Sequence, residues 1–125
     1  MRFSHKYKAY SGSRKSENVR AVFEVLEREN GYLGDFSKLN IEHCLPDSDG
    51  EENSEIGNLM LLEKKINDEC KNKPLSEKLD LYSKSELYEP NQLVLQHARE
   101  KEFNIGKRTE QIAEDLYSYI SKIES

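Results

Sequence analysis

Apolar residues recur at steps of three and four in two long stretches of the chain. This spacing predicts amphipathic helices over residues 17–30 and 105–123. In the first stretch the apolar positions are Val19, Val22, Phe23 and Leu26. In the second they are Ile105, Ile112, Leu116, Tyr119 and Ile123. Ser16 and Asn104 are placed to cap these two helices, and Gly31 is a natural end for the first.

Two short apolar runs in the middle of the chain predict strands. Residues 41–46 read IEHCLP, and Pro46 ends any regular element there. Residues 56–62 read IGNLMLL, which suits a second strand antiparallel to the first, although the start of a buried helix fits the same run. Residues 31–40 and the acidic stretch 47–55 are expected to be loops.

The rest of the chain favours helices. From Glu63 the pattern turns helical, is interrupted at Pro74 and then resumes, while Pro90 marks a boundary before a helix over residues 91–103. The order is helix, strand, loop, strand and several helices. It predicts an α+β fold, mostly helical, in a single domain of 125 residues with one central hairpin.

The charge distribution adds a possible partner to this picture. The net charge is −5, yet residues 1–20 carry six basic residues and one acidic residue. A basic arm over residues 1–15 could follow phosphates, and an ordinary solvated terminus explains it equally well. The negative total argues against tight, unaided binding to nucleic acid. Because the chain has neither a membrane-spanning apolar run nor a secretory signal, we expect a cytoplasmic protein with no membrane partner.

Glu42 and His43 are the first candidate chemical groups, since they are adjacent polar residues in an apolar strand. Adjacent strand residues point to opposite faces, so the strand end would have to distort to bring both to one site. Asn58 lies fifteen residues after His43, and Asn67 lies nine residues after Asn58. Taken singly, each has an ordinary explanation: a solvent-facing pair, a turn-closing asparagine and a polar helix position.

Together these motifs resemble the HNH (His-Me finger) nuclease domain at the C-terminus of GmrSD-type restriction enzymes and related defence proteins. The pattern EHxLP matches residues 42–46, IGNLxLL matches residues 56–62, and Asn67 matches the asparagine that follows. An N-x-x-x-x-x-K stretch matches residues 72–78. The sequence departs from the family at Met60, where threonine is common, and at Asp47, where glutamine is common.

The resemblance extends to the last helix and implies an architecture. A late I-x-x-R pattern matches Ile105 and Arg108. We therefore expect one HNH domain over residues 1–125, with a ββα-metal core over residues 40–73 and helices over residues 75–123. The resemblance also implies hydrolysis of phosphodiester bonds in DNA, in bacterial defence against foreign DNA, with an NTPase or another defence-system protein as a partner.

The same resemblance assigns roles to individual residues. His43 would be the general base that takes a proton from water, and Asn58 would hold the loop that aims it. Glu42 and Asn67 would provide oxygen ligands for one divalent ion, which such hard ligands identify as Mg²⁺ or Mn²⁺. The candidate phosphate contacts are Lys73, Lys78 and Arg108. The guanidinium fork makes Arg108 the strongest of these, whereas the two lysines also fit an ordinary charged helix face.

Two other functions remain open at this point. The chain could be a non-catalytic binding or assembly module that docks onto a larger defence complex through its apolar helices, or it could be a nuclease that acts on RNA. The sequence contains no GxxxxGK[ST] loop, so any use of a nucleotide would come from a partner. The two cysteines, Cys44 and Cys70, do not form a CxxC pair, and we expect reduced, partly buried thiols.

Overall fold

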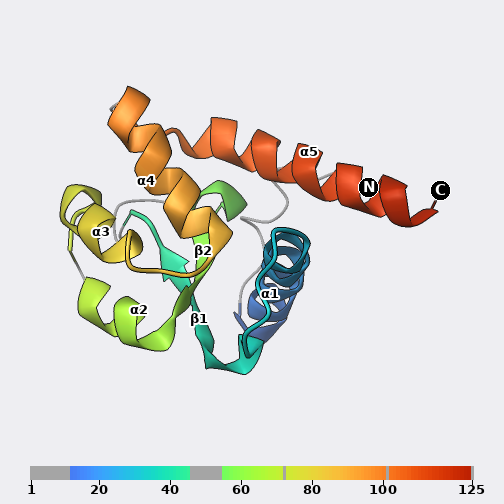
Figure 1. Cartoon of the computed structure of the whole chain (residues 1–125), viewed down its shortest axis with the longest axis horizontal. Helices are drawn as coiled ribbons and strands as arrows, with labels where there is room; N and C mark the ends of the chain where they lie inside the picture. The colour runs from blue at the N-terminus through green and yellow to red at the C-terminus, as the bar shows by residue number, and fades with distance from the viewer. Residues whose placement is uncertain (1–11, 46–54, 72, 101, 125) are drawn as a thin grey trace.

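The structure is a computed structural model that describes residues 12–45, 55–71, 73–100 and 102–124 (Figure 1). Most of the expected basic arm and of the acidic loop lies outside these ranges. Within them the chain folds as a mostly helical α+β unit around one small antiparallel sheet, as the sequence predicts. No helix of the described part is long and apolar enough to cross a membrane.

The first helix, α1 (Gly12–Glu29), begins earlier than expected. The prediction that Ser16 caps it is wrong, because Ser16 lies inside the helix. Residues 12–16 contain no proline, and extending a helix costs less than starting one. The predicted end is confirmed: Gly31 adopts a φ of 96°, in the left-handed region that glycine enters without strain, and its N–H donates to the carbonyl of Arg28.

The central hairpin is confirmed, with shifted boundaries. Strand β1 (Leu39–His43) pairs antiparallel with β2 (Leu59–Glu63), so that Glu42 is opposite Met60 and His43 is opposite Leu59. A short 3-10 turn precedes each strand, η2 (Phe36–Lys38) before β1 and η5 (Ile56–Asn58) before β2. Residues 56–58 were expected to be part of the second strand.

Four helices follow the hairpin: α2 (Lys64–Cys70), α3 (Leu75–Tyr82), α4 (Tyr88–Glu100) and α5 (Ile105–Glu124). The prediction that Pro90 precedes α4 is wrong. Pro90 lies in the first turn of this helix, where a missing N–H breaks no helical hydrogen bond. The cap predicted for α5 is confirmed, since the side-chain oxygen of Asn104 accepts a hydrogen bond from the N–H of Lys107 at 2.9 Å.

The core forms around β2. Its residues 59–62 are all buried, and because alternate strand residues point to opposite faces, both faces of β2 must be covered. Helices α1, α2 and α4 pack on this strand, and α5 lies against η5 and α1 (Figure 1). The apolar positions predicted for α1 belong to this core, as do Ile112 and Leu116 of α5, with Phe23 fully buried and Ile112 2% exposed.

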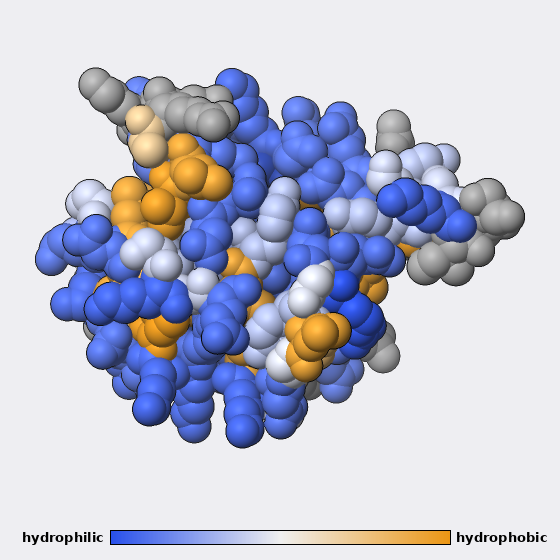
Figure 2. Space-filling model, in the orientation of Figure 1, coloured by the Kyte–Doolittle hydropathy of each residue, from blue (hydrophilic) through white to orange (hydrophobic). Residues whose placement is uncertain are grey.

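The surface is largely polar. On the face shown in Figure 2, hydrophilic side chains predominate and apolar ones form small, separate patches. Among the described residues, the large apolar side chains that are exposed are Leu33, Leu95 and Tyr117. They lie on three different parts of the chain, which is ordinary for a folded domain.

Candidate functional site

The carboxylate of Glu42 is buried, with only 4% of the residue exposed, and both of its oxygens are bound. Oε1 accepts a hydrogen bond from Nδ2 of Asn67 at 2.8 Å. Oε2 accepts one from the Tyr82 hydroxyl at 2.6 Å and lies 3.1 Å from Nζ of Lys78. A carboxylate is tolerated inside a protein when it is paired and hydrogen-bonded in this way.

Three elements bring these groups together. Asn67 comes from α2, while Lys78 and Tyr82 are four residues apart on α3 and so share one face of that helix. Asn40 is two residues before Glu42 on β1 and therefore points to the same side of the strand. Its Nδ2 donates to Oδ1 of Asn67 at 3.3 Å. The polar network thus occupies the face of β1 that α2 and α3 cover.

Lys78 is part of this network and not a surface cation. Its side chain is 4% exposed. Nζ donates to the carbonyls of His43 at 2.7 Å and Cys44 at 3.3 Å, in addition to pairing with Glu42. These three acceptors match the three N–H bonds of an ammonium group. The expectation that Lys78 contacts a phosphate is therefore corrected, because its charge is directed into the protein.

Tyr82 provides a neutral donor to the same carboxylate. It is fully buried, and burial together with the nearby Cys44 and Glu42 raises the pKa of its phenol far above the usual value. The hydroxyl consequently stays protonated and donates a hydrogen bond to Glu42. Neither Tyr82 nor Asn40 belongs to the sequence motifs described above. The spacing of Asn40 and Glu42, two residues apart on a strand, was a usable signal for Asn40.

Asn58 fixes the segment that follows His43. It is fully buried, and its main-chain carbonyl accepts a hydrogen bond from the N–H of Cys44 at 2.8 Å. Its side chain accepts from the N–H of Leu45 at 2.8 Å and donates to the carbonyl of Leu45 at 3.0 Å. These bonds hold Cys44 and Leu45 in place, and the expected role of Asn58 in aiming His43 stays a prediction.

His43 is the last residue of β1 and is half-buried. Its carbonyl is bound by Lys78, and the two residues after it are bound by Asn58, so the backbone is held at His43 and directly after it. Strand alternation directs its side chain away from the face that carries Glu42. The structure therefore joins Glu42 and Asn67 directly, whereas His43 follows Glu42 in the chain with its side chain directed to the opposite face of β1.

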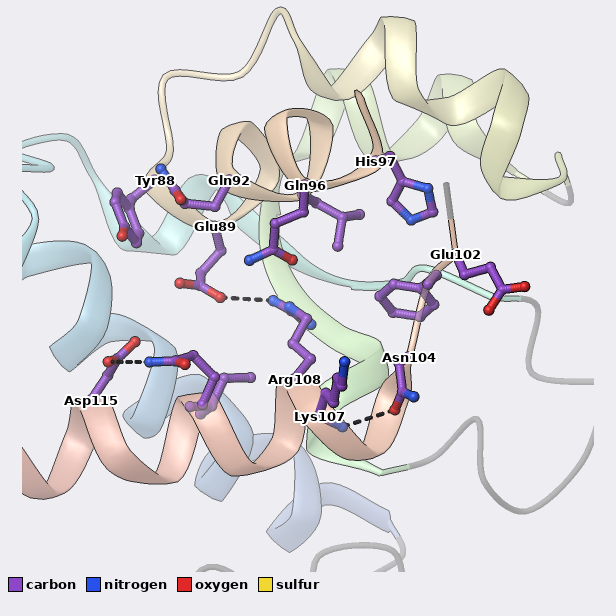
Figure 3. A pocket seen from close by; sticks show the side chains of 14 residues that line it. Tyr88, Glu89, Gln92, Gln96, His97, Glu102, Asn104, Lys107, Arg108 and Asp115 are labelled. Atoms are coloured by element: carbon purple, nitrogen blue, oxygen red, sulfur yellow. Dashed lines mark hydrogen bonds and ion pairs between the residues drawn. The ribbon is translucent and has the colours of Figure 1, made fainter. Parts of the chain in front are cut away.

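Arg108 binds inside the protein and not at a surface. It is 9% exposed, and Nη1 donates to the carbonyls of Gly57 at 2.7 Å and Leu59 at 2.8 Å. Nη2 forms an ion pair with Glu89 at 2.8 Å (Figure 3). The two carbonyls flank Asn58, so Arg108 holds the turn from which Asn58 acts. The expectation that Arg108 contacts a phosphate is corrected, because the guanidinium fork already has internal partners.

Gly57 allows α5 to lie directly against this turn. A Cβ atom at this position would fall well inside contact distance of the Ile105 carbonyl and the Thr109 hydroxyl. The N–H of Gly57 donates to that hydroxyl at 2.9 Å. The close approach therefore requires glycine, which explains the G of the IGNL motif without a chemical role.

Lys73 lies in the connection between α2 and α3 and is half-buried. Its backbone N–H donates to the carbonyl of Cys70 at 3.0 Å. Its role as a phosphate contact stays a prediction.

Cys44 and Cys70 are free and buried, as expected. Burial raises the pKa of each thiol to about 11, so both stay protonated and neither is suited to metal binding or nucleophilic attack. Across the described ranges, no three side chains of His, Cys, Asp or Glu cluster in a way that could hold a metal ion. A cation beside Glu42 would therefore depend on amide oxygens, water and phosphate.

A cavity of about 380 Å³ lies between α4 and α5 (Figure 3). It is lined by Arg108, but by none of Glu42, His43 and Asn67. Several of its polar groups pair with each other, including Gln111 with Asp115 at 3.0 Å. His97 stacks on Phe103 there, and its Nε2 is buried without a hydrogen-bond partner. This cavity is separate from the Glu42 network.

One family of known proteins matches most of the chain. The family described as the C-terminal domain of GmrSD restriction endonucleases matches residues 2–115. No curated protein and no solved structure matches the chain. Because the family match covers most of the 125 residues and includes the hairpin and the Glu42 network, the chain belongs to the C-terminal domain family of the GmrSD restriction endonucleases.

Proposed function

We propose that the chain is a metal-dependent endonuclease of the HNH type that hydrolyses phosphodiester bonds in DNA. Membership in a family of restriction endonuclease domains supports a nuclease. The HNH assignment depends on the hydrogen bond from Nδ2 of Asn67 to Oε1 of Glu42, which measures 2.8 Å. This contact lies near the end of β1, the strand whose last residue is His43. Glu42 and His43 are adjacent in the sequence, whereas Asn67 is 25 residues from Glu42, and the fold brings Glu42 and Asn67 into direct contact.

Glu42 and Asn67 would hold a single Mg²⁺ or Mn²⁺ ion. A carboxylate and an amide oxygen are hard ligands, which these ions prefer, and a site with few protein ligands leaves room for water and phosphate. Asn67 presents Nδ2 to Glu42, and its Oδ1 accepts a hydrogen bond from Nδ2 of Asn40. The amide groups of both asparagines would therefore have to turn over for Oδ1 of Asn67 to face an ion. When bound, such an ion provides positive charge that stabilises the phosphate oxygens and the leaving group.

His43 would act as the general base. A neutral imidazole accepts a proton near neutral pH, and this proton would come from the water that attacks phosphorus. The hydrogen bonds of Lys78 to the His43 carbonyl, and of Asn58 to Leu45, hold the backbone at His43 and directly after it. Such support keeps a catalytic side chain within the narrow geometry that a reaction requires.

The chain would act in the cytoplasm, in defence against foreign DNA, together with a partner that brings it to its substrate. The net charge of −5 supports a partner, because phosphate binding depends on positive charge. An NTPase or another defence-system protein fits this need. The fold favours this proposal over a docking module, since the apolar positions of α1 and Ile105, Ile112 and Leu116 of α5 are buried and are not free to bind.

A plasmid-nicking assay tests the proposal. Supercoiled DNA is incubated with the chain and Mg²⁺ or Mn²⁺, with and without EDTA and a candidate partner protein. We expect metal-dependent nicking that His43→Ala abolishes. The matched control is His97→Ala, which removes a histidine outside the Glu42 network and should leave nicking unchanged. Nicking by the His43→Ala variant would contradict the proposal. So would a lack of nicking by the unmodified chain under every condition. Cleavage of structured RNA alone would indicate the RNA alternative.

A further inference from the structure

The cavity between α4 and α5 has a buried floor and an exposed rim. Leu93, Ile112 and the ion pair of Glu89 with Arg108 line it and are buried. Exposed residues of both helices line it as well, so the cavity opens to solvent. Its volume of about 380 Å³ lies within the range of about 300–1,000 Å³ that is usual for small-molecule sites. The cavity is therefore large enough for a small ligand.

Three polar side chains of α4 line this cavity with hydrogen-bonding atoms that no other described residue uses. Nε2 of His97 is buried and has no hydrogen-bond partner. The side-chain amides of Gln92 and Gln96 have none among the described residues, and Gln96 points from α4 toward α5 (Figure 3). A buried polar atom left unsatisfied costs free energy, so a partner from outside the chain would stabilise it. Each amide also offers both a donor and an acceptor.

The charges around the cavity disfavour an anion. Three of the lining residues are acidic, Glu89, Glu102 and Asp115, and two are basic, Lys107 and Arg108. The buried guanidinium of Arg108 is already neutralised by Glu89 at 2.8 Å. A phosphate group inside the cavity would meet three carboxylates and no unpaired buried cation, which is electrostatically unfavourable. The lining therefore suits an uncharged molecule.

Aromatic rings make one wall of the cavity suitable for a planar ligand. His97 and Phe103 stack with an angle of 26° between their planes and 5.9 Å between their centroids. Both residues are half-buried, so part of each ring surface remains accessible. Aromatic side chains bind flat heterocycles by stacking, and this interaction depends little on which heterocycle is bound.

We propose that the cavity between α4 and α5 binds an uncharged nucleobase, either free or as a nucleoside. A base is planar, stacks on aromatic rings and presents donors and acceptors along its edges. Gln92 and Gln96 would bind these edges, as glutamine binds adenine through two hydrogen bonds, and His97 would provide a further polar contact. The ligand is distinct from the DNA substrate, because the cavity contains none of Glu42, His43 and Asn67. Nicking measured without this ligand does not require the cavity.

Nuclear magnetic resonance of the full chain tests this inference. Adenosine and cytidine are titrated into isotope-labelled protein, and the side-chain signals of Gln92, Gln96 and His97 are followed. We expect saturable shifts of these signals, whereas ribose alone should cause none. Adenosine 5′-monophosphate should bind more weakly than adenosine, because its phosphate adds negative charge beside three carboxylates.

Two variants locate the ligand in the cavity. Gln96→Ala removes an exposed amide from a helix, which the fold should tolerate, and we expect the dissociation constant of the nucleosides to rise by roughly tenfold, the effect of one amide–base pair. Phe103→Ala should weaken binding by roughly the same factor through the loss of stacking. The matched control is Leu95→Ala, which changes a residue of α4 that is 52% exposed and does not line the cavity. It should leave the affinity unchanged.

Several results would overturn the inference. These are a lack of saturable shifts with either nucleoside, equal shifts with ribose alone, or unchanged affinity in Gln96→Ala, which keeps the inference testable if Phe103→Ala folds poorly. Binding of a short single-stranded oligonucleotide at the cavity, with neither nucleoside bound, would also overturn it. The titrations need neither a metal ion nor cleavage, so their failure would leave the proposed nuclease function standing.

Discussion

Asn58 binds both backbone polar groups of Leu45, accepting from its N–H at 2.8 Å and donating to its carbonyl at 3.0 Å. A side chain thereby takes the place of a strand neighbour just beyond the end of the β1–β2 ladder. Cys44 and Leu45 are thereby held in place although their partner, Asn58, is not part of a strand. This use of an amide depends on having one donor and one acceptor on the same group.

Asn58→Asp should therefore be more damaging than its small change in shape suggests. It keeps the acceptor for the Leu45 N–H but places a carboxylate oxygen against the Leu45 carbonyl. We expect the free energy of unfolding to fall by about 1–3 kcal/mol, the usual cost of leaving a buried polar group unsatisfied. Urea denaturation measures this, with Asn18→Ala on α1 as the control that should change stability by less than about 0.5 kcal/mol. Equal stability of Asn58→Asp and the unmodified chain would contradict the account.

The buried pair of Arg108 and Glu89 predicts a large loss of stability when one partner is neutralised. Glu89→Gln should cost about 3 kcal/mol, because the guanidinium would remain buried without its counter-charge. Glu89→Gln combined with Arg108→Met should cost less than the sum of the two single changes, and a double-mutant cycle measures the difference. Additive losses would contradict the coupling of Arg108 and Glu89. An Arg108→Lys variant that weakens DNA binding at full stability would instead support a contact between Arg108 and phosphate.

Glu27 predicts a specific dependence of stability on pH. Its buried carboxylate accepts hydrogen bonds from the N–H groups of Tyr88 and Glu89 at the start of α4, at 2.6 and 2.9 Å. Burial raises its pKa from 4.5 to about 7, opposed by these two hydrogen bonds and assisted by the charges of Glu89 and Glu63. The folded chain therefore binds the proton more tightly than the unfolded chain does.

The sign follows from this difference in affinity. The contribution of Glu27 to stability is fully present below pH 4.5 and is lost as the pH rises through about 7. Urea midpoints between pH 5 and pH 8 should thus fall for the unmodified chain relative to Glu27→Gln, which cannot titrate. Parallel curves for the two proteins would show that the carboxylate keeps an ordinary pKa.

Gly57→Ala should destabilise the protein because the new methyl group would meet the Ile105 carbonyl and Thr109. We expect a loss of about 1–3 kcal/mol, typical of overpacking. Gly106→Ala on α5 is the matched control, since its Cβ would meet nothing closer than the Asn104 side-chain oxygen at 3.5 Å. Alanine is the better helix former, so this variant should gain about 0.5–1 kcal/mol. Thermal denaturation of both variants distinguishes the two directions.

Much of the fold could be predicted from the sequence because the buried residues of a helix or strand recur at regular spacings. The spacing of apolar residues located α1, α5 and the two strands, and Asn104 and Gly31 marked helix ends through local chemistry. Pro90 misled because proline is compatible with the first turn of a helix as well as with its boundary. The 3-10 turn at η5 leaves no periodic signal over three residues.

The candidate site was less accessible to such reasoning. The sequence motifs identified Glu42, Asn58 and Asn67, but the phosphate contacts predicted for Lys78 and Arg108 were wrong. Their partners are backbone carbonyls 35 and 51 residues away in sequence, and nothing local shows that a lysine or arginine will be buried. Only the folded chain reveals that both charges hold the backbone around His43 and Asn58 and do not face solvent.

A crystal of the chain soaked in Mn²⁺ tests the central claim most directly, because anomalous scattering locates the ion. We predict one strong peak within about 2.2 Å of Oε1 of Glu42, with the Asn67 amide turned over so that its oxygen faces the ion and Oε2 still bound by Tyr82. A peak in the cavity between α4 and α5, or no peak beside Glu42 in a crystal soaked at saturating Mn²⁺, would contradict the account.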